Sequence, residues 1–207
     1  MIESIPTYPF KESGTILILG SAPCIFDDMA RALAAFPNAR KMGVSRIVSE
    51  VAVDHIFKIE KPQVCGIVRV HTACHPKAPK PLIHTTKAYR HSPCANYYWV
   101  VADAPKKRDG ICHTGTSGWA AAQVAAAMGF ERVIMCGCPV TGSGYMNAAP
   151  FKKAGGLTPD NFNHWNNPQG IVTYYQGNIR RTVGRFKGIV FSMSGFTRDL
   201  LGEPQGV

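Results

Sequence analysis

The stretch from residue 110 to residue 147 constrains the fold of this chain more than any other part of its sequence. Six alanines between residues 120 and 127 are followed by Gly129 and then by an apolar run at 133–136. Small side chains let a helix lie close to a sheet, and a glycine commonly ends such a helix. The pattern predicts a helix packed on a short, buried parallel strand, with a loop at 137–144 after the strand.

The residues just before this helix are small or carry hydroxyl groups, which is typical of a site for an anion. The first backbone N–H groups of a helix have no partner within it, and the helix dipole is positive at that end. A phosphate bound there would lie close to the backbone, which two glycines permit. The predicted phosphate site comprises Thr114, Gly115, Thr116, Ser117 and Gly118.

A glycine turn also follows the first apolar run, TILIL at residues 15–19. Residues 25–36 then place apolar side chains at helical spacing, with acidic residues in the first turn, where negative charge is favoured. This pattern predicts the first βα unit of a Rossmann-like domain, although the G-x-G-x-x-G fingerprint of dinucleotide sites is absent. The turn, which we expect to face the same ligand, consists of Gly20, Ser21, Ala22 and Pro23.

Strands alternate with helices along the rest of the chain, which predicts an α/β fold with a mostly parallel sheet covered by helices on both faces. Residues 46–53 are predicted to be a short helical or irregular piece, and residues 71–94 a surface loop with at most one short helix. We expect one domain over residues 1–207, with an extended leader at 1–13 and a lid-like loop at 147–170. Further strands are predicted at 40–45, 64–70, 97–102 and 188–192, and further helices at 170–187 and 196–201.

The composition is that of a globular protein, with 45% hydrophobic and 17% charged residues. No apolar run reaches the roughly 20 residues of a membrane helix, and the first residues lack the pattern of a signal peptide. An odd count of seven cysteines indicates reduced thiols rather than a disulfide framework. We therefore expect a cytoplasmic protein without a membrane span; the sequence predicts no oligomeric state.

Basic residues outnumber acidic ones, 23 to 13, which gives the chain a net charge of +10. Such an excess indicates an anionic partner and leaves three interpretations open: a solvated basic surface, a nucleic acid, or a small molecule that carries phosphate. A nucleic acid would bind weakly and without sequence preference, and its affinity would fall as salt rises. The basic residues cluster at 77–90, 106–108, 152–153 and 180–187.

Two His-x-x-Cys pairs mimic the ligand spacing of a structural zinc site. Structural zinc sites are usually richer in cysteine, and the three prolines between the two pairs explain the segment as an extended loop. We therefore expect no metal there. The residues concerned are His71, Cys74, His75, His91 and Cys94.

The order of these motifs resembles that of a known Rossmann-like family. Residues 16–24, ILILGSAPC, look like the strand and glycine turn that open its members. Residues 116–137 are similar to its second signature, a T/S-S-G helix that runs into a buried strand, and the C-terminal pattern around 187–194 agrees in layout. The family includes bacterial sialyltransferases of the Campylobacter type, archaeal pterin pyrophosphokinase-like proteins, and uncharacterised phage and prophage proteins.

The resemblance implies roles for individual residues. In the sialyltransferases of this family the two glycine-bearing loops hold the donor nucleotide, and a histidine in the lid serves as base; His164 falls at that place. The alternative is that His164 only forms hydrogen bonds within its loop. Ser21 stands where the family has an asparagine, and Ser45 lies near a second such position. The resemblance thus implies a nucleotide or nucleotide-sugar site without naming its base or acceptor. Tyr145, on the loop after the central strand, either contacts the phosphate or sugar or only packs within its loop.

These features together predict a glycosyltransferase-like protein that transfers a sugar from a nucleotide donor to a hydroxyl acceptor. Loop amides would stabilise the departing phosphate, while His164 deprotonates the acceptor. The alternative is a non-catalytic nucleotide-binding or nucleic-acid-associated phage or prophage protein. We expect a nucleotide-sugar donor as the partner, no tightly bound cofactor and no metal.

Overall fold

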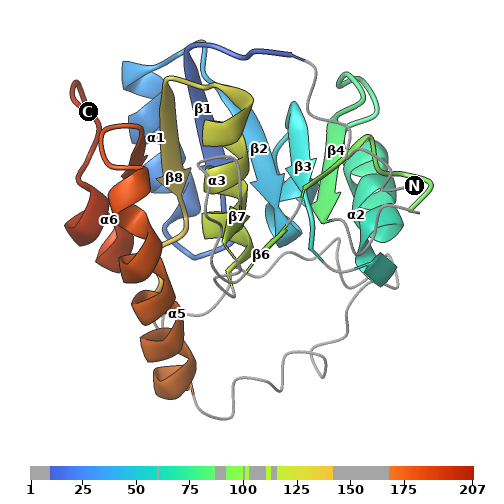
Figure 1. Ribbon diagram of the computed structural model, residues 1–207. Helices are drawn as coiled ribbons and strands as arrows, with labels where there is room; N and C mark the ends of the chain where they lie inside the picture. The colour runs from blue at the N-terminus through green and yellow to red at the C-terminus, as the bar shows by residue number, and fades with distance from the viewer. Residues whose placement is uncertain are drawn as a thin grey trace.

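The computed structural model describes residues 10–59, 61–86, 92–99, 101–102, 111–112, 116–141 and 168–207. Its main feature is a seven-stranded sheet in the order β5-β4-β3-β2-β1-β8-β9, in which every neighbouring pair of strands is parallel (Figure 1). The strands are β1 (Thr15–Leu19), β2 (Arg40–Val44), β3 (His55–Phe57), β4 (Leu82–Thr86), β5 (Tyr97–Trp99), β8 (Arg132–Cys136) and β9 (Val190–Ser192).

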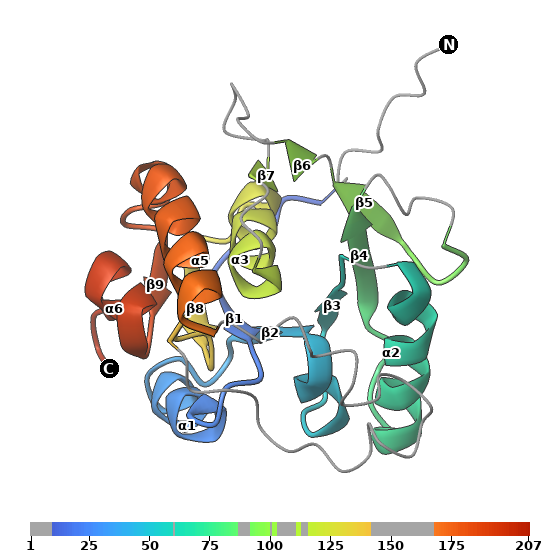
Figure 2. The ribbon, with the colours of Figure 1, turned by 90° about the horizontal axis from the view of Figure 1, so that it is seen from below.

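Helices cover both faces of this sheet, as Figure 2 shows along its carboxyl edge. The helices α1 and α2, with the short 3-10 helix η1, cover one face, and α3 and α5 cover the other. This arrangement confirms the predicted α/β Rossmann-like fold. The helical segments are α1 (Ile25–Ala35), η1 (Ser45–Ser49), α2 (Lys61–Cys74), α3 (Ser117–Met128), α5 (Pro168–Thr182), η4 (Val183–Arg185) and α6 (Gly195–Leu201). None of the described helices is long and apolar enough to cross a membrane.

The central strand β1 is buried on both faces, which explains its unbroken apolar sequence. Ile16 and Ile18 pack into the core beneath α3, and Leu17 and Leu19 pack into the core beneath α1. All four side chains are fully buried. Successive side chains of a strand point to opposite faces, so both cores are anchored on one five-residue segment.

Helix α3 owes its position to its small side chains and to its caps. It begins after Thr116, whose hydroxyl accepts a hydrogen bond from Trp119 N at 3.3 Å, and it ends at Gly129, which has a left-handed φ of 102°. Its alanines are mostly buried, and the Trp119 indole donates to Thr182 Oγ1 at 2.9 Å. That bond joins α3 to the end of α5 on the same face of the sheet.

The structure corrects the sequence prediction in the middle of the chain. Residues 64–70 lie in helix α2 and not in a strand, because Val64, Ile67 and Val70 form one buried helical stripe. The segment 71–94, predicted as a surface loop, contains the end of α2 and the buried strand β4. Strand β3 was not predicted, and the predicted strand at 97–102 divides between β5 and a separate ladder of β6 (Val101–Ala102) with β7 (Ile111–Cys112).

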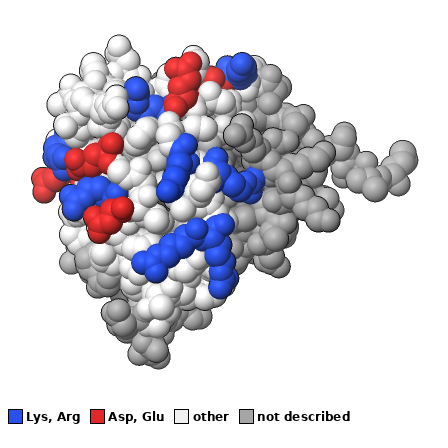
Figure 3. All heavy atoms as spheres, turned by 60° about the vertical axis from the view of Figure 1, so that its left-hand side comes forward, with Lys and Arg blue, Asp and Glu red and all other residues white. Residues whose placement is uncertain are grey.

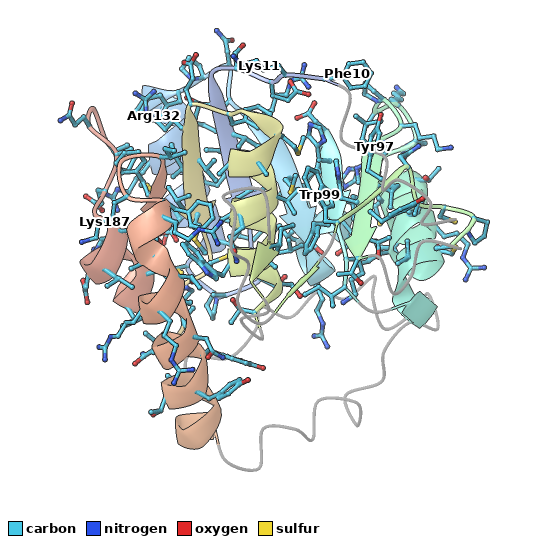
Figure 4. All side chains as sticks on the ribbon, in the orientation of Figure 1. Phe10, Lys11, Tyr97, Trp99, Arg132 and Lys187 are labelled. Atoms are coloured by element: carbon cyan, nitrogen blue, oxygen red, sulfur yellow. The ribbon has the colours of Figure 1, made fainter. Side chains whose placement is uncertain are left out.

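Strand β4 escaped prediction partly because its interior is polar. His84 is fully buried, and its ring accepts a hydrogen bond from Trp99 Nε1 at Nδ1, 3.3 Å away. Its Nε2 atom lies 3.1 Å from Nδ1 of His55, which is also fully buried. Because an indole only donates, neutral His84 carries its proton on Nε2 and donates it to His55. Figure 4 shows Trp99 and Tyr97 at this side of the sheet, away from α5.

Candidate functional site

The carboxyl ends of β1 and β8 meet where the strand order of the sheet reverses. From β1 the chain builds β2, β3, β4 and β5 outward on one side, and then crosses through α3 to β8 and β9 on the other. Ligands of open α/β sheets bind in the crevice at such a point. The candidate site is therefore the pair of loops that follow β1 and β8.

Backbone hydrogen bonds fix these two loops against each other. Gly20 N donates to Cys136 O at 2.8 Å, and Ala22 N donates to Gly137 O at 3.1 Å. A Cβ at Gly20 would overlap Gly137 O, so only glycine fits at that contact. The predicted turn at residues 20–23 thus lies directly beside the loop after β8.

The side chain of Cys138 fills the space between the two predicted binding segments. A Cβ added at Gly20 would lie 2.5 Å from Cys138 Sγ, and a Cβ added at Gly118 would lie 2.8 Å from the same atom. The loop after β1 and the start of α3 therefore converge on one sulfur atom. Burial raises the pKa of Cys138 to about 12, so its thiol stays protonated and serves as a packing group. Gly118 is accordingly required by this packing, whatever ligand binds nearby.

The first turn of α3 leaves hydrogen-bond donors at this edge of the sheet. Thr116 Oγ1 accepts from Trp119 N, and Thr116 O accepts from Ala120 N at 3.1 Å. Within the described part of the chain, no group accepts a hydrogen bond from the N–H groups of Ser117 and Gly118. Two amides and the positive end of the helix dipole are thus available to an anion.

A buried carboxylate, Asp28, connects three segments at the base of the site. It belongs to the first turn of α1 and is 4% exposed. Its Oδ2 atom accepts from Gly137 N at 2.9 Å and from Ser194 Oγ at 2.7 Å. Because a buried carboxylate must be hydrogen-bonded, these bonds fix the loops after β8 and β9 to helix α1.

Cys24 extends this chain of hydrogen bonds toward the surface. Its sulfur lies 3.4 Å from Ser194 Oγ, whose own proton is given to Asp28, so the thiol is the donor. Burial raises the pKa of Cys24, which agrees with a protonated thiol. The side chains of Cys24 and Ser194 are both partly exposed, in the turn after β1 and the loop after β9.

The remaining predicted residues fall in two groups. Ser21 is buried in the turn after β1, and its hydroxyl donates to Val44 O at 3.5 Å, so the end of β2 adjoins that turn. Ser45 follows directly as the first residue of η1. The other predicted residues lie outside the described part of the chain: Thr114, Gly115, Tyr145 and His164.

Four of the five histidine and cysteine residues considered for zinc lie in the described part of the chain. His71 Nε2 accepts a hydrogen bond from Val53 N at 3.2 Å, and its ring centroid lies 5.1 Å from that of His75. Cys74 and Cys94 are partly buried against the core beneath α1 and α2, and His91 lies outside the described residues. Among described residues, no group of three or more His, Cys, Asp or Glu is placed to hold a metal.

The sequence did not identify three residues that build the site. Asp28 carried a signal as an acid in the first turn of a helix, but that position predicts only a favourable dipole interaction. Cys138 and Ser194 carried no local signal, because their roles depend on tertiary contacts: Cys138 Sγ lies against Gly20 and Gly118, and Ser194 donates to Asp28.

Comparison with known proteins supports the fold. No protein-family model matches this sequence, and no curated protein sequence matches it. The fold is similar to that of the sialyltransferase CstII from Campylobacter jejuni, whose structure contains a substrate analogue, cytidine-5′-monophosphate. The TM-score is 0.53 at 12% identity, over 94% of this chain and 85% of that one.

The fold is also similar to the MAf glycosyltransferase from Magnetospirillum magneticum AMB-1, with a TM-score of 0.51 at 16% identity. That likeness covers 90% of this chain but 32% of the Magnetospirillum protein, so the chain spans about a third of that enzyme. The pterin pyrophosphokinase-like and phage groups of the sequence resemblance gain no support from these comparisons. The chain therefore has an α/β Rossmann-like fold similar to the folds of two glycosyltransferases.

Proposed function

We propose that this chain binds a nucleotide or nucleotide-sugar at the carboxyl ends of β1 and β8, and that it is a glycosyltransferase-like enzyme. The observation that carries the proposal is the convergence of two segments at the point where the strand order reverses. They are the turn at 20–23 and the start of α3, where the amides of Ser117 and Gly118 have no partner among the described residues. Similarity of fold to two glycosyltransferases supports it. The donor phosphate would lie at Ser117 and Gly118.

Sugar transfer requires two different tasks of the site, one at the donor phosphate and one at the acceptor hydroxyl. The leaving nucleotide gains negative charge at its phosphate, which fixed amide donors and a helix dipole stabilise without reorganising. The acceptor hydroxyl must lose a proton, and we propose His164 as the base, since a neutral imidazole suits that task near pH 7. His164→Ala should then abolish transfer while leaving nucleotide affinity close to that of the wild type.

One substitution can remove a single phosphate-binding amide while preserving the helix. Proline is favoured at the first position of a helix, and Thr116, the preceding residue, already has the extended φ and ψ of −111° and 126° that proline requires. Ser117→Pro should therefore fold normally and lose one hydrogen bond to the phosphate, which weakens binding by about 1.5–3 kcal/mol. Calorimetric titration with the best ligand from a thermal-shift screen, begun with cytidine-5′-monophosphate, measures this loss.

Ser117→Ala is the matched control, because it removes the hydroxyl and retains the amide. It should bind more tightly than Ser117→Pro. If Ser117→Pro melts like the wild type and binds the same nucleotide equally well, the phosphate does not lie at the start of α3.

The basic surface supports a second candidate function, the binding of nucleic acid without catalysis. Figure 3 shows the side of the molecule that is on the left in Figure 1. Separate Lys and Arg side chains lie across the middle and lower part of this mostly uncharged face, and the acidic side chains lie at its top and left, beside other basic ones. Residues 168–198 contain five basic residues and no acidic one. Such a face attracts phosphate backbones through counterion release.

We expect single-stranded DNA to bind weakly through this face and to dissociate as salt rises. Arg181→Gln, on the exposed surface of α5, should lower both the affinity and its salt dependence. Arg31→Gln is the control, since Arg31 already pairs with Glu203 at 2.9 Å. Fluorescence anisotropy at a series of salt concentrations measures the affinity and its salt dependence for both variants. Sequence-selective binding that tolerates physiological salt would favour the nucleic-acid function over the transferase.

A further inference from the structure

Two cysteines meet at the α2 side of the sheet, apart from the candidate site. Cys65 lies in the first half of α2, and Cys94 lies in the connection between β4 and β5. Cys65 Sγ lies 3.8 Å from Ser92 Oγ, and Cys94 follows two residues after Ser92, close enough for each thiol to shift the pKa of the other. Ala95 N donates to Ser92 O at 3.1 Å, which closes a turn that brings both Ser92 and Cys94 to α2. Both cysteines are partly exposed.

The surroundings of the two sulfur atoms differ in a way that assigns each a role. Cys94 is the largest influence on Cys65 and lowers its pKa, while Arg69, one helical turn further along α2, lowers the pKa of both thiols. The pKa of Cys94 is raised, first by Cys65. The thiolate is the reactive form of cysteine, so Cys65 is the attacking sulfur and Cys94 is its neighbour and resolving partner.

The other described cysteines lack this combination. Burial raises the pKa of Cys136 and of Cys138, which keeps both thiols protonated. Cys24 is engaged with Ser194. Cys74 shares α2 with Cys65 and is also partly exposed, and it packs against the core beneath α1 and α2. Cys65 and Cys94 are thus a partly exposed pair in which the pKa of one thiol is lowered.

We propose that Cys65 and Cys94 are a redox-sensitive pair, which a low-molecular-weight disulfide such as oxidised glutathione converts to an intramolecular disulfide. Cys65 loses its proton to solvent, and its thiolate attacks one sulfur of glutathione disulfide, releasing the first glutathione thiolate. Cys94 then attacks the Cys65 sulfur of the mixed disulfide and releases the second. The protein loses two electrons and two protons, and glutathione disulfide becomes two molecules of glutathione.

The disulfide would attach the β4–β5 connection covalently to α2. The turn at 92–95 would be held against the helix, and the unfolded chain would be restricted by a closed loop from residue 65 to residue 94. The melting temperature of the oxidised protein should therefore exceed that of the reduced protein. No part of this proposal depends on nucleotide binding.

Peptide mapping of the intact chain tests the proposal. The protein is incubated with oxidised glutathione, alkylated without reduction and digested, and the products are identified by mass spectrometry. We expect a peptide that links Cys65 to Cys94, and modification of Cys65 at least about tenfold faster than that of Cys74. Cys94→Ser should accumulate a lasting glutathione adduct on Cys65, because the resolving thiol is gone. Cys74→Ser should behave like the wild type.

Two results would overturn the proposal: wild-type protein that forms no Cys65–Cys94 link, or labelling of Cys65 no faster than that of Cys74. A second measurement on the wild type needs no substitution. Phenylarsine oxide, which bridges neighbouring thiols, should protect Cys65 and Cys94 from alkylation together. Independent alkylation of the two in its presence would equally refute a neighbouring pair.

Discussion

Replacing Gly20 by alanine is expected to lower the free energy of unfolding by roughly 3 kcal/mol, near the upper end of the usual cost of overpacking. The added Cβ would overlap Gly137 O, a backbone atom that cannot move without disturbing the bond from Ala22 N to the same oxygen. It would also lie 2.5 Å from Cys138 Sγ. Urea denaturation of the wild type and the variant measures the difference.

The glycines of this chain provide matched controls for that result. Gly118→Ala meets only side-chain atoms, with Cys138 Sγ nearest at 2.8 Å. In a Cys138→Ala background, Gly118→Ala should lower the free energy of unfolding only slightly, whereas Gly20→Ala should still lower it about as much as in the wild type. Gly177→Ala, in the interior of α5 with open space around it, should instead stabilise by about 0.5–1 kcal/mol. Rescue of Gly20→Ala by Cys138→Ala would show that the sulfur, and not the backbone, sets the constraint.

Acid is expected to destabilise the protein strongly through the buried histidine pair. Burial is the main cause that lowers the pKa of His55 to about 4 and that of His84 to about 3. Asp54 and Glu12 raise the pKa of His55, Arg40 lowers it, and His55 lowers that of His84. A protonated His84 would also direct an N–H group at the indole N–H of Trp99, so the existing bond would break.

The direction of this effect follows from proton binding. Below pH 6.5 the unfolded chain binds protons at both histidines while the folded chain does not, so stability falls as the pH falls from about 6.5 toward 4. A pKa that is one pH unit lower in the folded than in the unfolded chain corresponds to about 1.4 kcal/mol. His55 alone should therefore lower the free energy of unfolding by roughly 3 kcal/mol between pH 6.5 and pH 4. Urea denaturation at a series of pH values measures the slope.

The variant His55→Gln tests whether the two buried histidines cause this pH dependence of stability. Its amide oxygen can still accept the hydrogen bond from His84, but it does not titrate, so the dependence of stability on pH between 6.5 and 4 should become shallower. A wild-type protein whose unfolding free energy is constant between pH 7 and pH 5 would contradict the assignment of two neutral, buried imidazoles.

The elements around the centre of the sheet could be predicted because their sequence patterns are unambiguous. The unbroken apolar run of β1, the alanine-rich α3 with its terminal glycine, and β8 lie close to their expected bounds. Residues 64–70, VCGIVRV, form an apolar run short enough for either a strand or a helix. Only the spacing of Val64, Ile67 and Val70 indicates the helix that the structure contains. Strand β3 has three residues, too few for a period of two to be recognised.

The candidate site was predictable only in part, for a related reason. The two glycine-bearing segments carry local signals, and the structure brings the turn at 20–23 and the start of α3 to one sulfur atom. The identity of that atom, Cys138, depends on tertiary packing that no local pattern encodes. Asp28 is similar, because its partners are the loops after β8 and β9.

The pairing of β1 with β8 has a consequence for how the chain reaches its native state. Thr15 pairs with Arg132, 117 positions away, although β1 pairs with β2 on its other side after one short helix. During synthesis from the N-terminus, β1 can join β2 early, but its second edge stays open until β8 has emerged from the ribosome. Contacts this distant in sequence form slowly, and an open apolar edge invites association between nascent chains. The candidate site at the carboxyl ends of β1 and β8 is thus among the last parts to assemble, so an incomplete chain exposes an aggregation-prone strand edge before it can bind a ligand.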